Sequence, residues 1–154
     1  MNGGVEIRAM QDADAPEVHA IHTDCLRRTL RNHYEEHQIV AWMTGRAPEG
    51  YLRARDGGED FLVAVASDHV VGFTSWAGGE LLSLFVHPDA QRFGLGTRLV
   101  EAAMAQAGAV GSPIVAIKAA LGAARFYEKF GFLDTGPGST MKRGVEIPDR
   151  RMRR

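Results

Sequence analysis

Three apolar stretches at residues 61–66, 70–77 and 80–86 follow one another with very little chain between them. The segment SDH separates the first two, and two glycines separate the last two. Runs rich in β-branched and aromatic residues with such short reversals are typical of strands joined as hairpins. The chain is therefore constrained to place three adjacent strands in its first half.

The residues before this run predict a strand, two helices and two loops. Alternation of apolar and polar residues predicts a strand over 5–10. Apolar positions then recur at helical spacing over 18–26, and a second helix is predicted over 34–43. The glycine-containing segments 44–50 and 55–60 are predicted to be loops.

The residues after the run predict a second half that alternates helix and strand. A helix is expected from Leu95 to Ala107, followed by a strand over 114–118. A short helix in the segment 123–132 is expected to end at Gly131, and one or two strands follow it. The pattern as a whole predicts an α/β protein, with residues 1–154 forming a single domain.

Composition and charge exclude several classes of protein. Lys and Arg number 18 against 19 Asp and Glu, so no overall field attracts the chain to nucleic acid or a membrane. Cys25 is the only cysteine, which excludes an internal disulfide and favours a reducing compartment. No apolar segment is long enough to span a membrane or to direct secretion. We therefore expect a cytoplasmic protein without nucleic-acid or membrane partners.

A glycine-containing turn lies between the third strand and the long helix. The strand is expected to end near Val86, Pro88 breaks it, and Gly94 and Gly96 precede the helical pattern. Free amides at a helix start bind phosphate well, and glycines let an oxyanion approach them. The sequence fits neither the nucleotide P-loop, which needs Gly-Lys followed by Ser or Thr, nor the dinucleotide fingerprint. The two glycines are therefore interpreted either as a phosphate site or as an aid to tight packing.

Two motifs together resemble those of the GCN5-related N-acetyltransferases. Gln91, Gly94 and Gly96 form the pattern Q-x-x-G-x-G after the strand, and AARFYEKFGF at 123–132 is similar to the second cofactor segment of the family. The resemblance implies a mixed, mostly antiparallel sheet of six to seven strands with about four helices. It also implies that two central strands, about 81–86 and 114–118, splay apart to form an acetyl-coenzyme A cleft.

The resemblance further implies a set of cofactor-binding residues and no metal. Amides of residues 92–97 would hold the diphosphate, and Phe85 or Val86 would polarise the thioester carbonyl. Backbone groups of residues 84–86 would lie open in the cleft. The implied cofactor-binding residues are Leu84, Phe85, Val86, Gln91, Arg92, Phe93, Gly94, Leu95, Gly96, Thr97 and Phe126.

Tyr127 and Glu80 are the expected catalytic residues. By the resemblance, Tyr127 would protonate the leaving thiolate, since a phenol has a pKa near 10 and a thiol one near 8.5; alternatively, Tyr127 belongs only to an apolar helix stripe. Glu80 would accept the amine proton through a water molecule, or is a solvated residue at the start of a strand. His87 is a second candidate base, or a cap of the loop. Ala120 replaces an asparagine common in the family, which removes a polar contact to the cofactor.

These residues predict an acyl-CoA-dependent N-acyltransferase. Acetyl would pass from acetyl-CoA to a primary amine of a small molecule or peptide by direct attack in a ternary complex, and the family resemblance also allows a homodimer. Two alternatives stay open: a catalytically silent coenzyme A-binding module, and a zinc hydrolase in which HYEEH at 33–37 forms an H-x-x-E-H motif on one helix. The expected residues around the acceptor are His22, Arg27, His33, Tyr34, Trp42 and Trp76.

Overall fold

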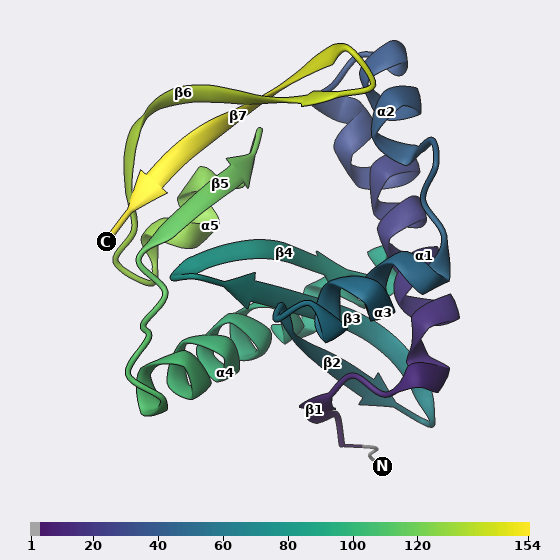
Figure 1. The fold of residues 1–154 in the computed structure, drawn as a ribbon, viewed down its shortest axis with the longest axis vertical. Helices are drawn as coiled ribbons and strands as arrows, with labels where there is room; N and C mark the ends of the chain where they lie inside the picture. Colours follow the sequence, from purple (N-terminus) through teal and green to yellow (C-terminus); the bar gives the residue numbers. More distant parts are fainter. Residues whose placement is uncertain (1–3) are drawn as a thin grey trace.

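A computed structural model describes residues 4–154, whose strands form one seven-stranded sheet in the order β1-β2-β3-β4-β5-β7-β6 (Figure 1). The strands are β1 (Glu6–Ala9), β2 (Asp60–Ala66), β3 (His69–Ala77), β4 (Glu80–Val86), β5 (Ala116–Ala120), β6 (Leu133–Lys142) and β7 (Val145–Arg153). Neighbouring strands are antiparallel except β4 and β5, which are parallel. The predicted hairpin run and the mixed, mostly antiparallel sheet are confirmed.

Among residues 4–154, five α-helices accompany the sheet, one more than the sequence predicted. They are α1 (Ala15–Asp24), α2 (Glu36–Met43), α3 (Pro48–Asp56), α4 (Leu95–Ala109) and α5 (Ala124–Glu128). The prediction of loops over 44–50 and 55–60 is wrong at residues 48–50 and 55–56, which belong to α3. Pro48 occupies the first turn of α3, where a missing amide costs nothing. Only Tyr51 of this helix is buried, so the sequence carries no apolar helical period there.

The two faces of the sheet are covered by different helices. Leu62 and Ala64 of β2 belong to the core beneath α4, whereas Phe61 and Val63 belong to the core beneath α1 and α3. This alternation follows from the two-residue side-chain period of a strand. Figure 1 shows α4 on one side of β2–β4 and α1 with α3 on the other. Among residues 4–154, no helix combines the length and the apolar character needed to cross a membrane.

The sheet opens between β4 and β5. These strands pair only at Glu80 with Ala116 and at Leu81 with Ile117, after which they diverge (Figure 1). Beyond that point β5 keeps its partner β7 as far as Ala120. The predicted splaying of two central strands is confirmed, although β5 lies two residues later than the predicted 114–118. The remainder of β4 consequently has a free edge facing the gap.

A partly buried ion pair joins β1 to the start of α1 and leads to a stability prediction. Arg8 Nη1 donates to Asp14 Oδ2 at 2.7 Å, and the amide of Gln11 donates to the same oxygen at 2.7 Å. Burial alone would raise the pKa of Asp14, but the hydrogen bonds from Arg8 and Gln11 lower it below its ordinary value. A carboxylate with a lowered folded-state pKa stabilises the fold above its unfolded pKa and loses this effect as pH falls.

Asp14→Asn is accordingly expected to lower the free energy of unfolding by about 2 kcal/mol at pH 7. Urea unfolding of both proteins should show the difference in free energy of unfolding narrowing below about pH 4, where the unfolded wild type begins to bind the proton, and vanishing as pH falls through the lowered folded-state pKa. Asp56→Asn is the matched control: it removes a carboxylate that pairs with Arg55 but is 70% exposed, and little change is expected. A gap for Asp14→Asn that stays constant into acid would contradict the assignment.

Candidate active site

The N-terminus of α4 presents free amides next to the gap in the sheet. The first α-helical bond runs from the amide of Arg98 to the carbonyl of Gly94 at 3.1 Å, so the amides of Leu95, Gly96 and Thr97 precede it. In the part of the chain that the structure describes, no side chain caps this helix end. Such an end carries partial positive charge and suits an anion.

The two glycines of this turn differ in what they make possible. Gly94 has φ +69° and a Cβ there would meet nothing within 4 Å, so the backbone conformation and not packing requires glycine. A Cβ on Gly96 would lie 3.4 Å from the ring of Phe126, an ordinary contact distance. Tight packing therefore requires glycine at neither position.

The free edge of β4 offers backbone groups at alternate residues. The amide of His87 donates to Val71 O at 2.8 Å, and the register pairs Phe85 with Phe73. In an antiparallel ladder the polar groups of Phe85 then point to β3, while those of Leu84 and Val86 point to the gap. The expectation that all of residues 84–86 lie open is wrong for Phe85, and the amide of Val86 is the better placed to polarise a carbonyl.

The carbonyl of Val86 is already bound within the protein. It accepts a hydrogen bond from Cys25 Sγ at 3.1 Å and from Gln91 Nε2 at 3.0 Å. Gln91 Nε2 also lies 3.3 Å from Thr29 Oγ1, so this side chain braces the glycine turn against β4. Burial, followed by the charge of Asp24, raises the pKa of Cys25 to about 12, which keeps the thiol protonated and unreactive.

Two cavities meet at Tyr127. A cavity of about 670 Å³ occupies the gap between β4 and β5, and one of about 420 Å³ lies at the start of α4. Both are lined by Leu84, Val86, Gln91, Ala123 and Tyr127. Tyr127 is buried, and burial raises its pKa above the ordinary value. The Tyr127 side chain therefore stays protonated throughout the neutral range.

Most of the predicted cofactor-binding residues come together here. Residues lining the smaller cavity include Leu84, Val86, Gln91, Gly94, Gly96, Thr97 and Phe126. Phe85 lines the larger cavity. Leu95 is buried in the core and offers only its amide, while Phe93 is 73% exposed and lines neither cavity. The side chain of Arg92 lies outside the described part of the structure.

The two candidate bases do not line either cavity. Glu80 lies at the closed end of the gap, where β4 still pairs with β5. From there it reaches an amine only through intervening water, so its role stays a prediction. His87 Nδ1 accepts a hydrogen bond from the amide of Asp89 at 3.1 Å, which confirms that it caps the loop. The carboxylates that do line the larger cavity are those of Glu59 and Asp149.

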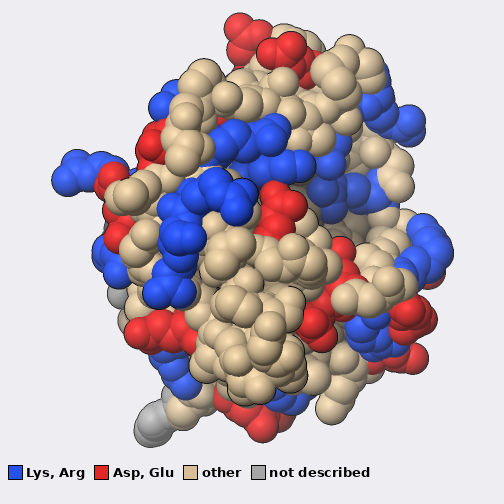
Figure 2. Space-filling model, turned by 60° about the vertical axis from the view of Figure 1, so that its left-hand side comes forward, with Lys and Arg blue, Asp and Glu red and all other residues tan. Residues whose placement is uncertain are grey.

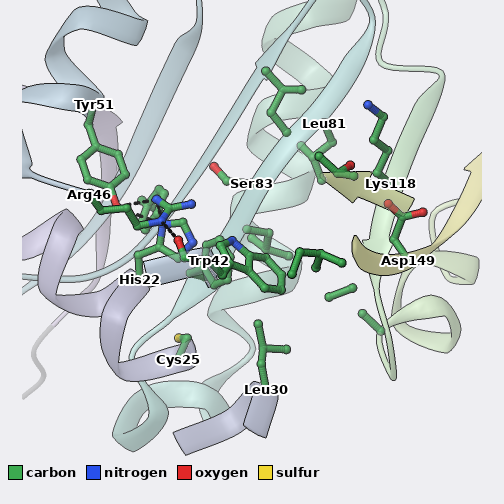
Figure 3. Close-up of a pocket in the computed structure, with 18 of the residues that line it drawn as sticks. His22, Cys25, Leu30, Trp42, Arg46, Tyr51, Leu81, Ser83, Lys118 and Asp149 are labelled. Carbon is green, nitrogen blue, oxygen red and sulfur yellow. Dashed lines mark hydrogen bonds between the residues drawn. The ribbon is translucent and has the colours of Figure 1, made fainter. Parts of the chain in front are cut away.

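Half of the residues expected around the acceptor line the larger cavity. His22, Tyr34 and Trp42 do, whereas Arg27, His33 and Trp76 do not. Sequence reasoning missed other polar lining residues, several of which Figure 3 labels; they are Arg46, Tyr51, Ser83, Lys118, Lys142 and Asp149. These residues belong to no short motif and lie far apart in the chain, so no local signal identifies them.

The zinc-hydrolase interpretation of HYEEH is wrong. That motif requires both histidines on one helix, but α2 begins at Glu36 and His33 lies in the turn before it. His37 Nδ1 instead lies 3.4 Å from Glu35 Oε2. Among residues 4–154, no group of three or more His, Cys, Asp or Glu side chains is arranged to hold a metal ion.

The open mixed sheet, with free amides at a helix start beside its opening, is the arrangement of one class of acetyltransferases. The model of the acetyltransferase (GNAT) domain family matches residues 10–152. This chain belongs to the GNAT acetyltransferase family. It is 26% identical over 128 residues to the uncharacterized N-acetyltransferase YafP of Escherichia coli K12, covering 83% of this chain and 81% of that protein.

Solved structures share the same fold over almost the whole chain. The GCN5-related N-acetyltransferase from Rhodopseudomonas palustris, also described as a class-II aminotransferase, superposes with a TM-score of 0.87 at 28% identity; the match covers 99% of this chain and 96% of that one. The PaiA N-acetyltransferase from Thermoplasma acidophilum, solved with coenzyme A, has a TM-score of 0.70 at 18% identity, covering 98% and 99%. This second likeness concerns the fold alone.

Proposed function

We propose that this chain transfers an acetyl group from acetyl-CoA to a primary amine by direct attack in a ternary complex. The observation that carries the proposal is the set of free amides on Leu95, Gly96 and Thr97 at the start of α4. Gly96 and Thr97 line a cavity that shares several lining residues with the cavity between β4 and β5. A diphosphate satisfies such amides, and a chain of amides such as pantetheine suits an unpaired strand edge. Membership of the GNAT family and the coenzyme A complex of the PaiA protein support this choice.

The residues present fit the diphosphate and the pantetheine arm of acetyl-CoA. The amides at the start of α4 would hold the diphosphate, and the backbone groups of Leu84, which point to the gap, would pair with the pantetheine arm. Ala120 lines the larger cavity in place of the usual asparagine, so the pantetheine arm relies on backbone contacts there. When bound, acetyl-CoA supplies an activated acetyl group in the form of a thioester.

The chain contributes polarisation and proton transfer to the reaction. The Val86 amide points toward the gap and stabilises negative charge that develops on a carbonyl oxygen. A carbon–nitrogen bond forms as the carbon–sulfur bond breaks, one proton leaves the amine, and one proton reaches the thiolate. Tyr127 is the donor of that second proton. Glu80, acting through water, is the predicted acceptor of the first.

The test combines cofactor binding with release of free thiol. Calorimetry should detect acetyl-CoA binding to the purified chain, and a panel of primary amines should contain substrates that release coenzyme A thiol. S-acetyl-N-acetylcysteamine, a truncated thioester without diphosphate, should react with a much higher KM. Binding without thiol release from any amine would instead support the catalytically silent module, and the absence of binding would overturn the proposal.

A further inference from the structure

Cations outnumber carboxylates in the lining of the large cavity. Four cationic side chains line it, Arg46, Arg53, Lys118 and Lys142, against the two carboxylates of Glu59 and Asp149. Within residues 4–154, the ion pairs within 4.0 Å involve none of the four cations. Asp149 already accepts a hydrogen bond from Arg151 at 2.8 Å, and Glu59 forms no ion pair with any of these cations. Figure 2 shows Lys and Arg side chains gathered along one border of a hollow.

Arg46 is held rigidly by neutral groups. Its Nε donates to the carbonyl of Trp42 at 2.9 Å, and its Nη1 donates to His22 Nδ1 at 2.7 Å and to Tyr51 Oη at 3.1 Å. Figure 3 shows Arg46, His22 and Tyr51 converging on one side of the cavity. Neutral partners orient the guanidinium without compensating its charge, which is the arrangement expected of a preorganised anion site.

His22 has an unpartnered donor beside the same cavity. Because Nδ1 accepts from Arg46, the proton of the neutral ring lies on Nε2. Burial and then the charge of Arg46 hold the pKa of His22 well below its ordinary range, so the ring is neutral. Its Nε2 atom is buried and has no hydrogen-bond partner among the described residues. Unpaired buried donors are rare in completed sites, and this one indicates a missing acceptor.

Lys142, at the end of β6, brings a second positive charge close to Arg46. Burial lowers the pKa of Lys142, and the charges of Arg46 and Lys118 lower it further. These three residues are therefore near enough to repel one another. A bound anion would relieve the repulsion and offset the cost of holding the charges partly out of water.

We propose that the acceptor amine carries a carboxylate, which Arg46 and Lys142 bind in the large cavity. The inference rests on the proposed function, because the acceptor is taken to occupy the part of the cavity that acetyl-CoA leaves free. A guanidinium fork and an ammonium group recognise an oxyanion, whereas a polyamine would meet repulsion here. Amines that carry a carboxylate are amino acids and other aminocarboxylates, and these are the proposed acceptors.

Matched substrate pairs test this selectivity directly. Thiol release would be measured with α-amino acids and with ω-aminocarboxylates of increasing length. Each substrate would be compared with the corresponding carboxamide, which keeps the amine and removes the negative charge. The carboxylates are expected to show kcat/KM about tenfold to hundredfold higher, in keeping with charge-assisted hydrogen bonds. Aminoalkylphosphonates of the same lengths would show whether other oxyanions replace the carboxylate.

Three variants test the residues. Lys142→Gln should raise KM for the carboxylate substrate about tenfold while leaving kcat and the carboxamide nearly unchanged. Lys142→Glu should reverse the preference in favour of amides and diamines. Arg46→Gln should show the largest increase in KM. It also removes hydrogen bonds to His22 and Tyr51 and could therefore fail to fold; in that case the Lys142 variants alone test the proposal. Arg31→Gln is the control, since Arg31 is exposed and lines neither cavity.

Two outcomes would overturn this inference while leaving the proposed function intact. One is efficient turnover of carboxamides or polyamines equal to that of carboxylates, and the other is an unchanged preference in Lys142→Glu. If acetyl-CoA binds but no amine reacts, the proposed function fails, and calorimetry with N-acetyl amino acids in the presence of coenzyme A still decides. The wild type should then bind the N-acetyl amino acid more tightly than Lys142→Gln does, and equal or absent binding would reject the carboxylate site.

Discussion

Tyr127→Phe is expected to lower kcat for acetyl transfer by about 10²–10³-fold, the range of a lost proton donor, with little change in acetyl-CoA affinity. The phenol lies where the two cavities meet. Removal of its hydroxyl leaves the packing around the ring intact, so thermal unfolding should change little. Steady-state kinetics together with calorimetry would separate the loss in turnover from any loss in binding.

The pH dependence of the wild type follows from the direction of the Tyr127 pKa. Since burial raises that pKa above the ordinary value near 10, the donor form persists at every pH below 10. Activity should therefore rise from pH 7 to 9 as the amine loses its proton, without a falling limb from Tyr127. A fall in kcat within that interval that is absent in Tyr127→Phe would contradict this assignment.

The leaving group supplies an independent check on the same residue. A thioester with a more acidic thiol, such as S-phenyl thioacetate, releases a thiolate that needs less help from a proton donor. The ratio of kcat between wild type and Tyr127→Phe should be smaller with this thioester than with acetyl-CoA. An equal slowing with both donors would assign Tyr127 a purely structural role, as part of an apolar helix stripe.

Gly96→Asp is expected to raise KM for acetyl-CoA at least about 100-fold through loss of amide contacts and charge repulsion. The new carboxylate would lie in the first turn of α4 and accept hydrogen bonds from the amides that the diphosphate needs. An acidic residue in the first turn of a helix is itself favourable. The variant should therefore melt at the same temperature as the wild type or slightly higher.

Two comparisons isolate the diphosphate site. Gly96→Ala adds only a Cβ, 3.4 Å from the Phe126 ring, and should raise KM far less than Gly96→Asp. With S-acetyl-N-acetylcysteamine, which has no diphosphate, wild type and Gly96→Asp should react equally. Unchanged acetyl-CoA affinity in Gly96→Asp, or an equal defect with the truncated thioester, would show that these amides do not bind the diphosphate.

Local patterns in the chain predicted the strands and the helix start of the candidate cofactor site. The hairpins over 61–86 and the glycine turn at 94–96 involve residues close in sequence, so their geometry follows from strand period, turn length and helix-end chemistry. The proposed roles of the turn and of Tyr127 came from a motif resemblance. Helix α3 was missed because its exposed surface leaves no apolar period to detect.

The acceptor half depends on contacts between distant segments. Arg46 comes from the connection between α2 and α3, Lys118 from β5 and Lys142 from the end of β6. Nothing in the sequence near any of these residues indicates that they share a cavity. The pairing of β5 with β7 and of β7 with β6 places Lys118 and Lys142 in one part of the sheet, and Arg46 lines the same cavity from the helical side.

By itself, therefore, the sequence determined the strands, the helix start with its free amides, and the candidate proton donor. Only the tertiary structure decided which β4 amide faces the gap, that Glu80 and His87 lie outside the cavities, and that three cations outside any ion pair line one cavity. The physical reason is that hydrogen bonds and side-chain periods act over a few residues, whereas the opening of the sheet results from strand pairings between segments far apart in the chain.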